Sequence, residues 1–156
     1  MVKSVHNEPN TNSRAEAALL RLFELAVVLG EYMERGLVQR KLTRARATVI
    51  WELHHRGAVT QRVLSEVLRV TPRNVTGLVD ALEADGFVAR TAHPTDRRAT
   101  LVTLTVRGRR TATGLAADYR RGAEHLFGGL PAADLTGFLA TTDAVLARLR
   151  EADRGR

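Results

Sequence analysis

Three polar side chains follow a helix start signal in the middle of the chain. Thr71 is suited to cap a helix and Pro72 to occupy its first position. Arg73, Asn74 and Thr76 are then exposed in the first turns. Arginine and asparagine can form paired hydrogen bonds with guanine and adenine edges, and threonine can bond a base or touch a thymine methyl group. The hypothesis is that this helix start binds DNA. On this triplet alone, solvation of an exposed helix remains open.

A second feature, the arginine pair Arg97 and Arg98, lies in the segment HPTDRRATLVTLT at 93–105. Segments 87–91 and 100–105 are strand-like, and His93 and Pro94 lie at a turn between them, which predicts a β-hairpin. Arginines at a hairpin tip can exploit the negative potential of a narrow minor groove. The two features together predict two contacts with the same duplex.

Helical periodicity supplies the elements that position these residues. Thr43 can cap a helix over 44–56, a short extended piece covers 58–60, and Thr60 can cap a helix over 61–70. The segment RVTP joins that helix to the one that starts at Pro72, which is typical of a helix-turn-helix with a wing behind it. The residues predicted to face inward are Ala47, Ile50, Trp51, Leu53, Val63, Leu64, Val67, Leu68, Val75, Leu78, Val79 and Leu82. Asp80, Glu83 and Asp85 are predicted to make the far end of the helix repel DNA.

Long apolar stripes flank this module. One runs over 15–36, and a seam spaced three and four residues apart runs from Leu135 to Leu149 in a last helix that starts near Pro131. One small domain cannot cover both, so a homodimer that buries them is predicted, with an intrachain helical layer as the alternative. The predicted division is a flexible arm over 1–13, a dimerisation helix over 14–41, the DNA-binding domain over 42–105, and C-terminal helices over 106–156 that complete the dimer interface.

Composition narrows the class of partner. A net charge of +7 in 156 residues indicates a polyanionic partner. Lys3 and Lys41 are the only lysines among the basic residues, and such an excess of arginine is also typical of GC-rich codon usage. The chain has no cysteine and no run near the roughly 18 apolar residues of a membrane span, so a cytoplasmic protein is expected. No nucleophile elbow, phosphate loop or dinucleotide fingerprint is present, so neither an enzyme nor a cofactor is expected. His54 and His55 are adjacent and point about 100° apart on a helix, so no metal site is expected.

From about Leu42 to Gly108 the chain closely resembles the MarR family of winged helix-turn-helix transcription regulators. The resemblance is carried by VTPRNVTGLVDALEADGFVAR and by DRRATLVTLTVRG. It implies a mainly helical fold with a small β-hairpin wing, an obligate dimer and a pseudo-palindromic DNA site. It also implies that Arg98 enters the minor groove, that Asp96 orients Arg98 through an ion pair, and that Arg97 meets phosphate.

These arguments predict two sets of site residues. The DNA-binding set is Thr71, Arg73, Asn74, Thr76, Gly77, Arg97 and Arg98. A pocket for a small aromatic or anionic effector is predicted from Tyr32, Met33, Trp51, His55 and Tyr119, each of which could equally be plain core. The predicted function is a ligand-responsive repressor. Two alternatives remain: a constitutive architectural DNA binder of the nucleoid type, and a helical adaptor whose basic face meets acidic proteins.

Overall fold

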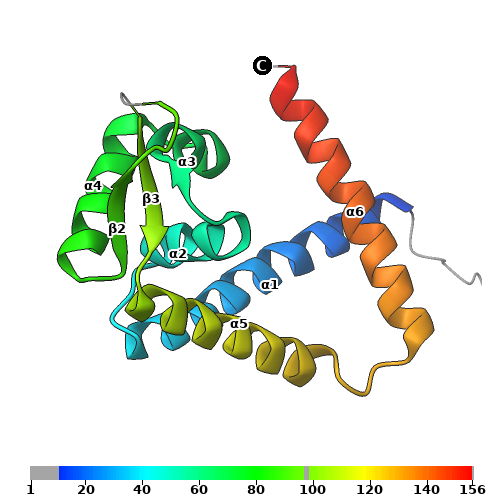
Figure 1. Ribbon diagram of the computed structural model, residues 1–156. Coiled ribbons are helices and arrows are strands. Elements are labelled where there is room, and N and C mark those ends of the chain that lie inside the picture. Colours follow the sequence, from blue (N-terminus) through cyan, green and yellow to red (C-terminus); the bar gives the residue numbers. More distant parts are fainter. Residues whose placement is uncertain (1–10, 97–98, 156) are drawn as a thin grey trace, which may run out of the picture. The chain divides into compact units, whose positions relative to one another are not determined.

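The structure is a computed structural model that describes residues 11–96 and 99–155 (Figure 1). Two compact units divide the chain, Met1–Ala112 and Thr113–Arg156. The elements in chain order are α1 (Thr11–Gln39), α2 (Arg44–Arg56), β1 (Val59–Thr60), α3 (Gln61–Leu68), α4 (Pro72–Ala84), β2 (Val88–Ala92), β3 (Thr100–Leu104), α5 (Val106–Phe127) and α6 (Ala132–Arg154). The prediction of a mainly helical fold with a small antiparallel wing and flanking helices is confirmed.

Short-range signals determine where the helices of the first unit begin and end. The side-chain oxygens of Thr43, Thr60 and Thr71 each accept a backbone N–H three residues further on, at 3.3–3.4 Å. These bonds satisfy amide groups that have no partner within the helix, so the three predicted caps are confirmed. Gly57 follows α2 with φ 77° and Gly86 follows α4 with φ 73°, a conformation that glycine adopts without strain.

The N-terminal helix is longer than predicted. Residues 11–13, expected to belong to the flexible arm, form the first turn of α1, and the rest of that predicted arm lies outside the described residues. Thr11–Ser13 lack an apolar period, but a helix that is already formed extends at little cost into polar residues that tolerate helical dihedral angles.

The sheet has three antiparallel strands in the order β1-β3-β2. The predicted hairpin pairs Val88 with Leu104 and Arg90 with Val102. The short extended piece before α3 becomes β1, which adds a third strand by pairing Val59 with Val102. The sheet therefore links the start of α3 to the wing.

The hydrophobic core of the described residues lies in the first unit. Its buried members are Leu42, Ala47, Val49, Ile50, Leu53, Leu64, Val75, Val79, Leu82, Phe87, Val88, Val102, Leu104 and Ala112. Trp51 was expected to face inward but is only half-buried, whereas Val49 is fully buried. The reason is that α2 contacts α3, α4 and β3, which shifts and widens its buried face.

A close backbone contact fixes the start of α5 to the end of the wing. The hydroxyl of Thr105 donates to the carbonyl of Gly86 at 2.7 Å and accepts the N–H of Gly108 at 3.0 Å. The carbonyl of Phe87 also accepts the N–H of Thr105 at 3.0 Å. Thr105 thus caps α5 and ties it to the chain that leaves α4.

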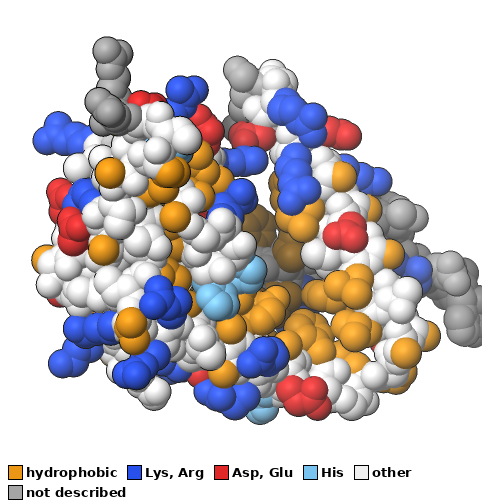
Figure 2. Space-filling view, in the orientation of Figure 1, with side chains coloured by type: hydrophobic (Ala, Val, Ile, Leu, Met, Phe, Trp, Pro, Cys, Tyr) orange, Lys and Arg blue, Asp and Glu red, His pale blue; other side chains and the backbone are white. Residues whose placement is uncertain are grey.

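The second unit contains most of α5 and all of α6. The rings of Phe127 and Phe138 lie 5.7 Å apart across the turn that joins these helices. Phe138, Leu139, Leu146 and Leu149 remain exposed along α6. Hydrophobic side chains gather on the visible surface of this unit (Figure 2). Over the ranges described above, no helix combines the length and apolar character needed to cross a membrane.

Candidate nucleic-acid interface

The start of α4 presents a polar surface on a fixed support. Arg73, Asn74, Thr76 and Gly77 are all exposed, whereas Val75 between them is fully buried. Val79 and Leu82 continue the buried stripe through later turns. The structure therefore places these four predicted DNA-binding residues together on one exposed face of a helix whose opposite face belongs to the core. Thr71 precedes them as the N-cap and is also exposed.

The turn between α3 and α4 determines how this face is presented. Arg69 adopts the left-handed conformation, with φ 52°, and ends α3. The hydroxyl of Ser65 donates to the carbonyl of Val70 at 2.6 Å, and the N–H of Val70 donates to the carbonyl of Ser65 at 3.2 Å. Ser65 thus holds both polar backbone groups of Val70, directly before the α4 cap.

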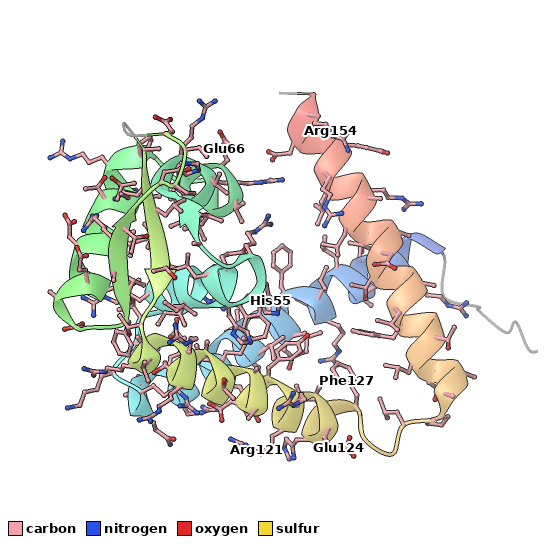
Figure 3. All side chains as sticks on the ribbon, viewed as in Figure 1. His55, Glu66, Arg121, Glu124, Phe127 and Arg154 are labelled. Carbon is pink, nitrogen blue, oxygen red and sulfur yellow. The ribbon has the colours of Figure 1, made fainter. Side chains whose placement is uncertain are left out.

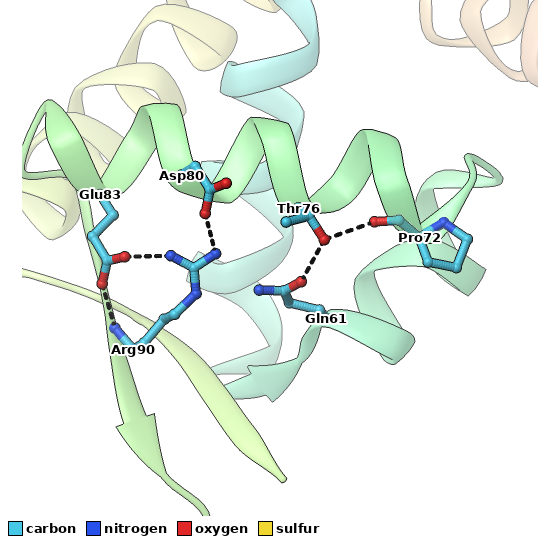
Figure 4. Close-up of polar contacts among 6 residues, drawn as sticks. All are labelled: Gln61, Pro72, Thr76, Asp80, Glu83 and Arg90. Carbon is cyan, nitrogen blue, oxygen red and sulfur yellow. Dashed lines mark hydrogen bonds and ion pairs between the residues drawn. The ribbon is translucent and has the colours of Figure 1, made fainter.

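A polar network connects α4 with β2 and with the start of α3 (Figure 4). The guanidinium of Arg90, on β2, forms ion pairs with Asp80 and Glu83 of α4. The backbone N–H of Arg90 also donates to Glu83 Oε1 at 3.0 Å. Next to it, Gln61 at the start of α3 lies 3.1 Å from the hydroxyl of Thr76.

The acids at the end of α4 that were predicted to repel DNA have cationic partners in the folded chain. Arg90 pairs with Asp80 and Glu83, and Asp85 pairs with Arg46 of α2 at 2.8 Å, so three carboxylates face two guanidinium groups and one net negative charge remains. The sequence argument considered the acids along α4 alone, but their partners come from elements that are adjacent only after folding. These ion pairs help to orient α4 and reduce the negative charge at its end, and repulsion of a duplex there stays a prediction.

The charge of Arg90 is stabilised by its acidic neighbours. Partial burial disfavours the charged guanidinium and would lower its pKa, but hydrogen bonds to Asp80 and then Glu83, with their negative charges, outweigh this effect and raise the pKa of Arg90. Arg90 is therefore a permanent cation at the centre of the network.

The wing turn is closed by backbone bonds at its base. The N–H of His93 donates to the carbonyl of Ala99 at 3.1 Å, and the N–H of Ala99 donates to the carbonyl of Asp96 at 3.0 Å. His93 Nδ1 also accepts the N–H groups of Thr95, at 3.4 Å, and of Asp96, at 3.2 Å. The sequence argument missed this role of His93, although a polar side chain two residues before a turn amide is a signal for it. Asp96 is exposed, and Arg97 and Arg98 lie outside the described residues.

Among the residues predicted to form an effector pocket, the structure shows a ring contact between Trp51 and His55. On α2, the rings of Trp51 and His55 lie 4.5 Å apart, and His55 Nδ1 is 2.9 Å from the carbonyl of Trp51. Figure 3 shows His55 near the end of α2. Tyr32 and Met33 are partly exposed on α1 of the same unit. Tyr119 belongs to the second unit and is exposed there.

A helix-turn-helix whose second helix exposes a polar face, followed by an antiparallel wing, defines a winged helix-turn-helix protein. Comparison with protein families agrees, since the MarR family model matches residues 42–100. Over these residues the chain is similar to the MarR family of winged helix-turn-helix transcriptional regulators. The matched family consists of transcriptional regulators, which agrees with the expectation of a non-enzymatic protein.

Relatives of known structure or description share this organisation. The chain is 30% identical over 104 residues to the HTH-type transcriptional repressor YetL of Bacillus subtilis, a match that covers 64% of this chain and 61% of YetL. The structure of Streptococcus pneumoniae FabT in complex with DNA matches with a TM-score of 0.75 and 21% identity, over 90% of this chain and 98% of FabT. The MarR family transcription regulator SP03579 matches with a TM-score of 0.80 and 17% identity, over 94% of this chain and 100% of that protein. The last two comparisons establish the fold.

Proposed function

We propose that this protein is a sequence-specific double-stranded DNA-binding transcriptional regulator that acts in the cytoplasm as a repressor. The observation that carries the proposal is the exposed face of Arg73, Asn74, Thr76 and Gly77 on a helix start anchored in the core. A face of this kind fits the major groove, where arginine and asparagine distinguish guanine and adenine. The repressor description of YetL and the DNA-bound state of FabT support the same function.

The wing supplies the second contact in this proposal. Arg98 enters the minor groove, Asp96 orients it, and Arg97 meets phosphate. The support for these roles is the backbone bond between His93 and Ala99, which flank this segment in sequence, together with the attraction of arginine to a narrow minor groove.

The active form is proposed to be a homodimer bound to a pseudo-palindromic site. Long apolar surfaces support this, because α1 exposes Leu19, Leu20, Leu22, Phe23, Leu25, Val27 and Val28, and α6 exposes Phe138, Leu139, Leu146 and Leu149. Isolated exposed apolar residues are ordinary, but contiguous stripes of this size mark association surfaces. A two-fold dimer would present two α4 helices about one helical turn of DNA apart.

Selection from random duplexes followed by binding measurements tests the proposal. A sequence-specific regulator selects an inverted repeat, and Arg73→Ala then weakens binding to it by about 1–3 kcal/mol and broadens the preference at one base pair. Arg56→Ala is the matched control, because it removes the same charge from an arginine of α2 that pairs with Glu52 at 2.7 Å. If selection yields only a weak preference, the architectural binder is correct. If no preference among DNA sequences is found, the result favours the adaptor for acidic proteins and contradicts the proposal.

The proposal also includes the release of DNA when a small aromatic or anionic effector binds the protein. Aromatic side chains with polar groups, as at Trp51 and His55, suit such a ligand. A ligand can release DNA only if it prefers a geometry whose helices miss the grooves. Titration of the protein–DNA complex with benzoate and its ring-substituted analogues tests this, with Trp51→Ala as the variant that loses the response.

A further inference from the structure

The orientation of the Gln61 amide determines which hydrogen bonds Thr76 can make. As drawn in Figure 4, the amide oxygen lies 3.1 Å from Thr76 Oγ1, which is also 3.0 Å from the carbonyl of Pro72. The single hydroxyl proton would then face two acceptors, and the amide nitrogen of Gln61 would face the guanidinium of Arg90, donor against donor. This arrangement leaves hydrogen-bonding groups in conflict.

Rotation of the amide by 180° removes both conflicts. The amide oxygen of Gln61 then accepts from Arg90 Nε at 3.2 Å and from Arg90 Nη2 at 3.0 Å, and its amide nitrogen donates to Thr76 Oγ1 at 3.1 Å. The Thr76 proton is left for the carbonyl of Pro72. Since oxygen and nitrogen of an amide are distinguished by their partners, the rotated orientation is the one we assign.

The resulting hydrogen bonds all run in one direction, from Arg90 to Gln61 to Thr76 to Pro72. Arg90 determines this direction because it is a permanent donor, held in place by Asp80 and Glu83. A cation at one end orients each following group, and the chain reinforces itself because every bond polarises the next. Thr76 is an exposed residue of the DNA-facing surface, so its remaining hydrogen-bonding capacity faces the ligand.

We propose that Gln61 and Arg90 are positioning residues for base recognition, because they restrict Thr76 to a methyl group and one acceptor lone pair toward DNA. This inference rests on the proposed DNA-binding function. A base that offers only acceptors at this position, which is guanine with N7 and O6, finds no donor on Thr76. Thymine offers a methyl group, and adenine and cytosine offer amino groups. Thr76 therefore disfavours guanine at the base it faces.

The test measures affinity for the four base-pair variants at one position of the selected site. Thr76→Val keeps the side-chain shape but lacks the hydroxyl. The position to vary is the base pair at which this substitution alters the base preference. The unmodified protein is expected to bind the guanine variant on the order of tenfold more weakly than its preferred base. Gln61→Met keeps the side-chain length and removes all three hydrogen bonds of the amide, and it should reduce this discrimination to about threefold or less.

A double-mutant comparison separates positioning from a general structural effect. In the Thr76→Val background, Gln61→Met should cause no further change in discrimination, because no hydroxyl remains to be oriented. Gln39→Met, the same exchange at the exposed end of α1, should leave discrimination unchanged in both backgrounds.

Three results would overturn the inference while leaving the proposed function intact. They are a preference for guanine at the Thr76 position, unchanged discrimination in Gln61→Met, and equal effects of Gln61→Met with and without the Thr76 hydroxyl. Failure of random duplexes to yield any selected sequence would instead overturn the proposed function, and this inference with it.

Discussion

Gly108 lies in the first turns of α5, directly against the backbone of Phe87. A Cβ atom at this position would be 2.0 Å from the carbonyl oxygen of Phe87 and 3.1 Å from Leu104 Cδ2. Even close carbon–oxygen contacts in proteins are about 3.3–3.6 Å long. Gly108→Ala therefore forces the start of α5 and the Phe87 carbonyl apart by about 1.3 Å or more, which is the difference between these two lengths.

The energetic cost of this displacement comes from the hydrogen bonds of the Phe87 carbonyl and from the packing around it. The Phe87 carbonyl accepts the N–H of Thr105 at 3.0 Å and lies 3.2 Å from the Thr105 hydroxyl. Loss of two such bonds costs about 1–3 kcal/mol. Overpacking around Phe87 and Leu104, both buried, adds about 1–3 kcal/mol. Alanine regains up to about 1 kcal/mol of helix propensity. The free energy of unfolding should therefore fall by about 3 kcal/mol, within limits of roughly 1 and 6.

Urea unfolding followed by circular dichroism measures this change. Gly77→Ala is the matched control, because Gly77 is helical in the same unit and a Cβ there meets nothing within 4 Å. Without DNA, that variant should be unchanged or more stable by up to about 1 kcal/mol. If Gly108→Ala is as stable as Gly77→Ala, the contact between α5 and the wing does not constrain the fold as described.

Four further outcomes are expected. Leu64→Ala should lower the free energy of unfolding by about 2–5 kcal/mol, because Leu64 is fully buried in α3; an unshifted urea midpoint would contradict this. Asn74→Ala should relax the preference at one base pair by about 1–3 kcal/mol, with the selected site as reference. Arg97→Ala should weaken all sequences alike and make the salt dependence of binding shallower by about one unit of slope, and a change in specificity would argue against a phosphate contact. A chain cut before Pro131 should sediment as a monomer, and an intact dimer would exclude α6 from the interface.

Local signals predicted most of the fold because their causes are local. Thr43, Thr60 and Thr71 each accept a hydrogen bond from a backbone amide three residues further along the chain. Both partners are close in sequence, so these helix starts can be predicted from the local residues alone. The alternation in 100–105 predicted the wing strand, and the period of three and four predicted which side of α4 is buried. The exposure of Arg73 and Asn74 follows from the same period.

Contacts between distant segments required the folded chain. Nothing in the spacing of Gln61, Arg90 and Thr76 indicates that they share a network, because the sheet and α4 bring them together only when β1, β2 and β3 pair. The same holds for Asp85 with Arg46, whose ion pair changes the electrostatics of α4. Residue types and periodicity therefore determine which side chains face outward on α4, since helix geometry is a property of the local backbone. The hydrogen bonds that Thr76 can still offer to a base depend on its two partners, Gln61 and Pro72, which lie 15 and 4 positions away in sequence. Only tertiary packing places Gln61, the more distant of the two, beside Thr76.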